Sequence, residues 1–310
     1  MKKKILLIVF CYLVSAICYQ SSAIFAAERA VISVIFSSDI EPYQQCWQGF
    51  REFLEEKNVA LWVSEHNLEK DKPEIISSKI NKKNPDIVFT LGTKASKLAK
   101  EKIKDIPIIF SMVLNPELII GPNITGVSMD IAPAMKLSEI KKILPEVKRI
   151  GLVYSPKTTP LYKEISEECK EFGFQLIGRK VDSGKEFPDA LKEICWQIDC
   201  FFMITDSEIY FSQSVEYLLL ESLRKKFPVI GLSSFYTKAG ALISFDCDYK
   251  DLGKQAGEIA LKIVDGEKPA NVQPSRPRKI KLSLNLITAE RLDIKIPPAI
   301  IKEASEVFDK

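Results

Sequence analysis

Short apolar runs alternate along the chain with longer stretches whose apolar residues recur at helical spacing. The run at 31–36 is almost wholly apolar and mostly β-branched, which is typical of a buried parallel strand. Pro42 then suits the first turn of a helix, and apolar residues follow it at helical spacing as far as Leu54. This alternation of strand and helix patterns predicts βαβ units and parallel sheets.

The same alternation continues through the chain. The pattern predicts strands at 31–36, 60–63, 86–91, 107–112, 149–154, 175–181, 200–204, 228–232, 241–245 and 280–286, and helices at 42–54, 73–82, 93–103, 133–144, 161–172, 187–197, 212–226 and 252–264. These strands are too many for one sheet, and two lobes fit a length of 310 residues better. We therefore expect an α/β fold with two doubly wound parallel-sheet lobes joined by a hinge.

Residues 1–26 have the pattern of a secretory signal peptide. Three lysines at 2–4 precede an uncharged apolar run at 5–16, and the small residues Ala23 and Ala26 offer cleavage positions. The apolar run is short for a membrane span, so an uncleaved anchor is the less favoured alternative. The protein is therefore expected to be exported, to the periplasm or to the outer face of the cytoplasmic membrane.

The composition excludes several classes of function. The 44 Lys and Arg residues nearly balance the 41 Asp and Glu residues, and removal of residues 1–26 would take away three lysines and no acid. The remaining chain would have no net charge, so nucleic acid is not an expected partner. His66 is the sole histidine, which excludes a His dyad or a His-rich metal site.

The cysteines give no sign of a metal or redox site. Five of the seven lie beyond residue 26, and no CxxC spacing occurs among them. Most have apolar neighbours and are expected in the core, while one disulfide, between Cys195 and Cys200, stays possible in an exported protein. A lipid anchor at Cys18 is not expected, because Ile17 stands where a small residue is needed. We expect no cofactor and no metal ion.

The loops after the predicted strands are rich in Ser, Thr, Asn and Asp, with Tyr and Phe among them. Ligands of open parallel sheets bind outside the carboxyl ends of the strands, so these loops are the candidate site. The loops are Ser37-Ser38-Asp39, Gly92-Thr93, Val113-Leu114-Asn115, Tyr154-Ser155-Pro156, Thr205-Asp206-Ser207, Ser233-Ser234-Phe235 and Phe245-Asp246. None contains a GxGxxG fingerprint, a P-loop or a GxSxG elbow, so polar groups that bind a ligand are favoured over catalytic groups.

An ordered set of short motifs resembles the ABC-transporter substrate-binding family with a type I periplasmic binding fold. The motifs are Pro42-Tyr43-Gln44-Gln45 with Gly49-Phe50, Pro85-Asp86 with Leu91-Gly92-Thr93, Pro107 to Phe110, Asn123 to Val127, Leu144-Pro145 with Lys148 to Gly151, Asp246 with Tyr249, Asp251-Leu252-Gly253, and Gly266 to Pro269. Two sites depart from the pattern: Leu114-Asn115-Pro116 stands where the family has Thr-Asp-Pro, and Thr205-Asp206-Ser207 where it has Thr-Asp-Asn. The departures lie in the predicted ligand loops and bear on the ligand class more than on the fold.

The resemblance implies a domain plan and a function. Lobe one is expected at 29–124 plus 241–274, and lobe two at 125–240 plus 275–310. The protein would be a monomeric, exported solute-binding protein of an ABC import system that holds a small polar or zwitterionic ligand between its lobes and delivers it to a membrane permease. Members of the family are often linked to aromatic amino acids, so an amino acid ligand is expected. The alternatives are a binding protein for a nucleoside or sugar and an exported α/β enzyme such as a hydrolase.

Seven side chains are the expected ligand contacts. Tyr43 would lie against an apolar or aromatic ligand body, and Thr93, with the N–H groups of its helix, would face an anionic group. Asn115, Tyr154 and Ser234 would supply polar contacts. An amino acid ligand needs a carboxylate for its ammonium group, because an unpaired buried cation is costly, and Asp206 and Asp246 are the acids expected there. No catalytic residue is expected, since the loops contain no nucleophile with a base.

Overall fold

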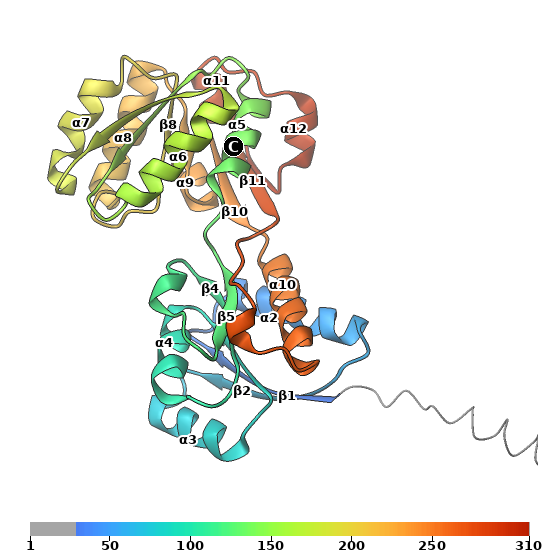
Figure 1. The fold of residues 1–310 in the computed structure, drawn as a ribbon. Coiled ribbons are helices and arrows are strands. Elements are labelled where there is room, and N and C mark those ends of the chain that lie inside the picture. Colours follow the sequence, from blue (N-terminus) through green and yellow to red (C-terminus); the bar gives the residue numbers. More distant parts are fainter. Residues whose placement is uncertain (1–28, 310) are drawn as a thin grey trace, which may run out of the picture. The chain divides into compact units, whose positions relative to one another are not determined.

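The computed structural model describes residues 29–309, and the predicted signal peptide lies outside this range. The chain forms two compact units (Figure 1). Unit 1 contains the chain up to Phe110 together with Ile119–Thr125 and Gly253–Gln273. Unit 2 contains Ser111–Leu118, Gly126–Leu252 and the chain from Pro274 onward. Each unit has its own sheet, so the prediction of two α/β lobes with largely parallel sheets is confirmed.

The sheet of unit 1 has five strands in the order β2-β1-β3-β4-β5, and β1 pairs in parallel with both β2 and β3. Its elements are β1 (Arg29–Phe36), α2 (Glu41–Glu56), β2 (Ala60–Asn67), α3 (Pro73–Lys83), β3 (Ile87–Leu91), α4 (Thr93–Lys102), β4 (Ile108–Val113) and β5 (Ile124–Ser128). All residues of β3 and β4 are buried, as their almost wholly apolar sequences predict. Trp47 and Phe50 of α2 pack on Phe89 of β3, with ring centroids 6.0 and 4.3 Å away.

The sheet of unit 2 has seven strands in the order β12-β11-β10-β9-β8-β6-β7. Its elements are α5 (Pro133–Ile143), β6 (Arg149–Tyr154), α6 (Thr159–Phe172), β7 (Gln175–Lys180), α7 (Phe187–Ile194), β8 (Cys200–Phe202), α8 (Ser212–Lys225), β9 (Val229–Gly231), α9 (Ser234–Ala239), β10 (Ile243–Cys247), β11 (Ile280–Asn285), α11 (Leu286–Arg291), α12 (Pro298–Glu303) and β12 (Glu306–Phe308). Helix α10 (Tyr249–Val264) begins in unit 2, and from Gly253 onward it belongs to unit 1. The pairing of β10 with β11 is antiparallel, and the other pairings that we describe in this sheet are parallel.

The expected return of the chain to the first lobe at residue 241 was wrong. Strand β10 lies in the second sheet, where it pairs in parallel with β9 and antiparallel with β11. Helix α9 makes the short crossover from β9 to β10, so the chain stays in unit 2 until Leu252, inside α10. Two residues that the sequence placed in loops after strands lie within strands instead. Asp246 lies within β10, opposite Lys281, and His66 lies within β2, which runs to Asn67 and not to residue 63.

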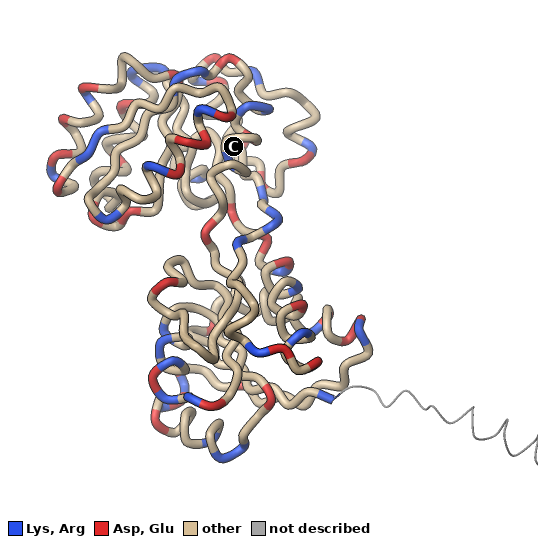
Figure 2. The backbone as a smooth tube through the Cα atoms, viewed as in Figure 1, with Lys and Arg blue, Asp and Glu red and all other residues tan. Residues whose placement is uncertain are grey.

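The charged side chains are mixed in sign over both units (Figure 2). The five cysteines of the described residues are all buried and none forms a disulfide, so the Cys195–Cys200 bridge is absent. Within residues 29–309, no helix combines the length and the apolar character needed to cross a membrane.

Candidate functional site

Each sheet has one point at which the strand order reverses. In unit 1 the chain passes from β1 to β2 on one side and then to β3 on the other side of β1. In unit 2 it passes from β6 to β7 and then to β8 on the other side of β6. Ligands of open α/β sheets bind at the carboxyl ends of the strands beside such a point. The two candidate edges are therefore the loops after β1 and β3 and the loops after β6 and β8.

At the unit 1 edge, Ser37 connects the end of β1 to the start of α4. Its backbone N–H donates to the Leu91 carbonyl at 3.0 Å, and its Oγ accepts from the Ala95 N–H at 2.9 Å. A hydrogen bond also joins the Ser37 and Tyr43 hydroxyl groups. This arrangement fixes Tyr43, which is partly buried, and burial raises the pKa of its phenol above the ordinary value. The Tyr43 ring is thus held beside the end of β1.

Gly92 allows this packing. Its φ of +90° lies in a region that residues with a side chain rarely adopt. A Cβ added at this position would lie 2.3 Å from the Tyr43 hydroxyl oxygen and 2.7 Å from Ser37 Oγ. The glycine that precedes α4 therefore leaves room for both hydroxyl groups. The sequence signal Gly92-Thr93 reflects this close approach, and Thr93 itself is the partly buried first residue of α4.

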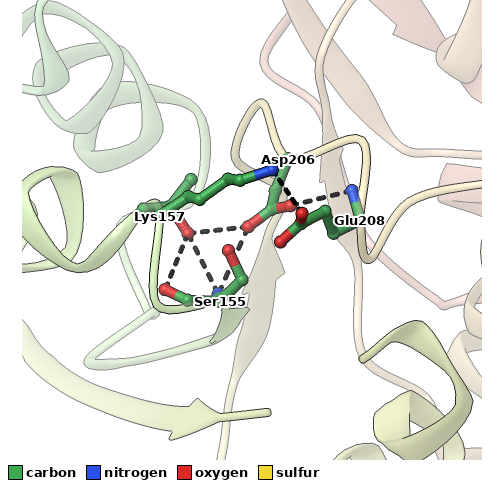
Figure 3. A network of polar contacts seen from close by, with 5 residues as sticks. Ser155, Lys157, Asp206 and Glu208 are labelled. Atoms are coloured by element: carbon green, nitrogen blue, oxygen red, sulfur yellow. Dashed lines mark hydrogen bonds and ion pairs between the residues drawn. The ribbon is translucent and has the colours of Figure 1, made fainter. Parts of the chain in front are cut away.

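At the unit 2 edge, Asp206 is the acceptor at the centre of a hydrogen-bond network (Figure 3). One carboxylate oxygen accepts from the Ser155 N–H at 3.2 Å and from Thr158 Oγ1 at 2.7 Å, and the other accepts from the Glu208 N–H at 3.0 Å. Beside it, the Lys157 ammonium group pairs with the Glu208 carboxylate. The Asp206 side chain is only 5% exposed. Its charge is therefore used to join the loop after β8 to the loop after β6.

Ser155 and Ser37 occupy equivalent positions, since each directly follows the first strand beside the reversal point of its sheet. Their hydroxyl groups differ. Ser37 Oγ has two partners, whereas Ser155 is 0% exposed and its Oγ is the buried side-chain polar atom without a hydrogen bond in the part of the chain that we describe. A buried hydroxyl without a partner costs free energy, so this position is one where a bound group can supply a missing hydrogen bond.

Tyr154 lies at the end of β6, and its ring stacks on that of Tyr162 with centroids 4.1 Å apart and an interplanar angle of 7°. Burial raises the pKa of the Tyr154 phenol. One face of the ring is therefore covered by Tyr162 of α6.

Asp246 and Ser234 lie together at the carboxyl edge of unit 2. The Ser234 N–H donates to Asp246 Oδ2 at 2.7 Å, and the Tyr249 hydroxyl donates to Oδ1 at 3.4 Å. Burial nevertheless raises the pKa of the Asp246 carboxyl group. Ser234 thus contacts Asp246 through its backbone and not through the hydroxyl that the sequence reasoning proposed.

The structure brings some of the seven predicted residues together. Asp206 is joined to the residue that follows Tyr154, and Ser234 is hydrogen-bonded to Asp246. Asn115 stands apart, because it is exposed in the loop after β4 and takes no part in the hydrogen bonds described above. Ser37 and Ser155 stand in the predicted site loops but were not among the seven expected contacts, and Thr158 was not selected from the sequence. The two serines could have been chosen as contacts, because each is the first polar residue after a buried strand.

No group of three or more His, Cys, Asp or Glu side chains is placed to hold a metal ion within residues 29–309. The arrangement at both edges consists of hydroxyl groups, carboxylates, backbone N–H groups and tyrosine rings. These groups suit the reversible binding of a small polar molecule.

Known proteins resemble this chain over most of its length. The profile of a family described as "ABC transporter substrate binding protein" matches residues 31–308. A tyrosine-binding protein of Clostridioides difficile strain R20291 is 24% identical over 267 residues, which cover 80% of this chain and 76% of that protein. An uncharacterised protein of Rickettsia prowazekii is 23% identical over 271 residues, with 86% and 87% covered.

Two solved structures have the same fold. The ligand-free, open structure of a substrate-binding protein with adhesive properties from Clostridium difficile has a TM-score of 0.72 and 21% identity, over 91% of this chain and 100% of that one. The structure of an ABC domain in complex with L-Trp from Streptococcus pneumonia has a TM-score of 0.58 and 23% identity, over 90% and 100%. These similarities confirm the predicted type I periplasmic binding fold.

Proposed function

The chain belongs to the ABC transporter substrate-binding protein family, whose members bind ligands and are not enzymes, and from this we propose that it captures an aromatic amino acid outside the cytoplasm for an ABC importer. One observation carries the choice of ligand: a tyrosine lies at the reversal point of each sheet, Tyr43 in unit 1 and Tyr154 in unit 2. Aromatic rings pair favourably with one another, which suits an aromatic ligand body. The names of two similar proteins, one tyrosine-binding and one bound to L-Trp, support the same choice.

We assign distinct roles to the two predicted acids. Asp246 is the proposed partner of the ligand ammonium group. Its carboxylate is partly exposed and can therefore be reached by a ligand, and its partial burial disfavours a charge that has no ionic partner. Asp206 already accepts three hydrogen bonds from its own loops, so its proposed role is to hold the Tyr154 loop in place. Replacing Asp246 with Asn should lower the affinity for an amino acid about 10-fold or more.

The remaining predicted residues complete the proposed site. Tyr43 would contact the ligand body, Thr93 an anionic group, and the hydroxyl groups of Tyr154 and Ser234 its polar atoms. Asn115 is the least supported of these contacts, since its exposed side chain belongs to neither edge network.

The ligand class can be tested directly. The purified protein is denatured and the released small molecules are identified by mass spectrometry, and the refolded protein is then titrated calorimetrically with L-tyrosine, L-tryptophan, L-phenylalanine, ribose and adenosine. We expect an aromatic amino acid to be released and to bind. Binding of ribose or adenosine with no binding of any amino acid would replace this proposal by that of a sugar or nucleoside carrier.

Export and partners form a separate part of the proposal. The pattern of residues 1–26 supports a cleaved signal peptide, a location outside the cytoplasmic membrane and a membrane permease as the partner. Amino-terminal sequencing of the protein recovered outside the cytoplasm should begin at Ile24 or Ala27. Light scattering during size-exclusion chromatography should give the mass of a monomer. An intact Met1 in the recovered protein would contradict cleavage.

A further inference from the structure

Lys136 is a charged residue at the unit 2 edge that the sequence reasoning did not select. It lies on α5, and its side chain is partly buried. Its Nζ is 5.8 Å from the ring centroid of Phe202, the last residue of β8. Electrostatic interactions also link it to Asp246 and Cys247, at the end of β10. The ammonium group therefore lies at the carboxyl ends of the strands, where ligands of open α/β sheets bind.

The acids near Lys136 are engaged with other groups. Asp130 forms an ion pair with Arg276 at 2.8 Å, and Asp246 accepts from Ser234 and Tyr249. Within residues 29–309 no hydrogen bond or ion pair joins Lys136 to an acceptor, and its Nζ lies over the face of the Phe202 ring. Burial disfavours its charge and lowers its pKa, although Asp130, Cys247 and Asp246 oppose the effect. A partly buried ammonium group in this state gains from an anion that can approach it.

We propose that the Lys136 ammonium group binds the carboxylate of the ligand while Asp246 binds its ammonium group, so that unit 2 supplies an ionic partner for each charge of an amino acid. This inference rests on the proposed function, and it names the ligand class as α-amino acids with a free carboxylate. Only β9 separates β8, whose last residue Phe202 lies under Lys136, from β10, which carries Asp246, so the two charged groups lie along one edge of the sheet. Charge-assisted hydrogen bonds to both groups would select amino acids over amines and over acids.

The test compares ligands that lack one charge. The parent, Lys136→Met, Lys136→Gln and Asp246→Asn are titrated calorimetrically with L-tyrosine, tyramine and 3-(4-hydroxyphenyl)propionate, and with L-tryptophan and tryptamine. Lys142→Met is the matched control, because Lys142 lies on the same helix and forms an exposed ion pair with Glu139. Both Lys136 variants should bind the amino acid about 10-fold or more weakly while binding the amine as the parent does. Asp246→Asn should weaken the binding of the amino acid and of the amine but not the binding of the propionate.

Each other result overturns a defined part of the argument. If the parent binds neither L-tyrosine nor L-tryptophan, the proposed function falls and this inference falls with it. If the parent binds and both Lys136 variants bind the amino acid equally well, only this inference falls. If the Lys136 variants bind the amino acid and the amine with equally reduced affinity, Lys136 has a structural role, and the inference that it binds the carboxylate is overturned. Thermal unfolding of each variant without ligand checks the fold, and Lys136→Gln keeps the test open if Lys136→Met fails to fold.

Discussion

Ser37 and Ser155 occupy equivalent positions in the two sheets, but their hydroxyl groups differ in hydrogen bonding. Ser37 Oγ accepts from the Ala95 N–H and bonds to Tyr43, whereas Ser155 Oγ is buried without a partner. Ser37→Ala should lower the free energy of unfolding by about 1 kcal/mol or more, since it leaves a buried N–H without its acceptor. Ser155→Ala should leave it unchanged or raise it. Urea unfolding of the ligand-free proteins measures both, and a larger loss for Ser155→Ala than for Ser37→Ala would contradict the assignment.

A second prediction at this scale concerns the acidity of Asp246. Burial raises the pKa of its carboxyl group above the ordinary value of 3.8, so the folded state binds this proton more tightly than the unfolded state. The resulting stability is present in full below about pH 4 and is lost as the pH rises through the folded-state pKa. Asp246→Asn cannot titrate. The parent should therefore lose stability relative to this variant between pH 4 and 7 when both are unfolded by urea without ligand. A parent that gains stability relative to the variant over this range would show that the folded-state pKa is lowered.

At the scale of elements, the contact of α10 with α2 depends on two glycines. A Cβ at Gly253 would lie 1.9 Å from the Cys46 carbonyl oxygen and 2.7 Å from the Phe50 nitrogen, both backbone atoms. A Cβ at Gly257 would meet the Phe53 side chain at 2.8 Å, and a side chain can move. In an exposed helix either Gly→Ala change would stabilise by about 1 kcal/mol. Here Gly253→Ala should destabilise by about 1–3 kcal/mol or more, because the two backbones must separate.

Gly257→Ala is the matched control for this contact. It lies on the same helix one turn later, so both substitutions change the intrinsic helix propensity equally. Thermal unfolding should rank the proteins parent, Gly257→Ala, Gly253→Ala in decreasing stability, or place Gly257→Ala close to the parent. Equal stability of Gly253→Ala and Gly257→Ala would mean that the helices are farther apart than described.

The elements also show what a sequence pattern can and cannot predict. Strands such as β3 and β4 are apolar except for one hydroxyl residue each, and their burial on both faces follows from that composition. The membership of β10 in a sheet was predicted wrongly, because the sequence Ile243–Cys247 is equally compatible with either sheet. Its pairing with β9 and β11 decides the question, and these contacts are tertiary. Strand β5 and the helices α9, α11 and α12 were not predicted. Each has only five or six residues, which is too short to show a clear strand or helix periodicity in the sequence.

The sequence likewise predicted only part of the candidate site. The rule that ligands bind beyond the strand ends selected Thr93, Tyr154 and Asp206 from the sequence, and all three lie at the reversal points. The rule could not show that the Asp206 charge is used within the protein. It also could not find Lys136, whose side chain reaches the strand ends from a helix that merely looks amphipathic in sequence.

At the scale of the whole molecule, both units are built from segments distant in sequence. Gly253–Gln273 completes unit 1, where the Thr125 hydroxyl also donates to the Val272 carbonyl at 2.7 Å. The chain from Pro274 onward completes unit 2, where β11 covers the edge of β10 and Arg278 pairs with Asp251 at 2.9 Å. Neither unit is complete before the last fifth of the chain has been made. Folding of either unit should therefore require the C-terminal segment.

Truncation tests this dependence. A chain that ends at Leu252 lacks most of α10, so the α2 face around Cys46 loses its cover, and it lacks β11, so β10 becomes an exposed edge strand that invites aggregation. We expect this chain to unfold without cooperativity in a thermal scan and to be digested rapidly by protease. A chain that ends at Ala304 is the control, since it loses only the three-residue edge strand β12 and the final residues. It should unfold cooperatively with a modest loss of stability, because an edge strand of this length makes few contacts. Cooperative unfolding of the chain that ends at Leu252 would instead show that the earlier segments form a stable core, and that the C-terminal segment only adds to it.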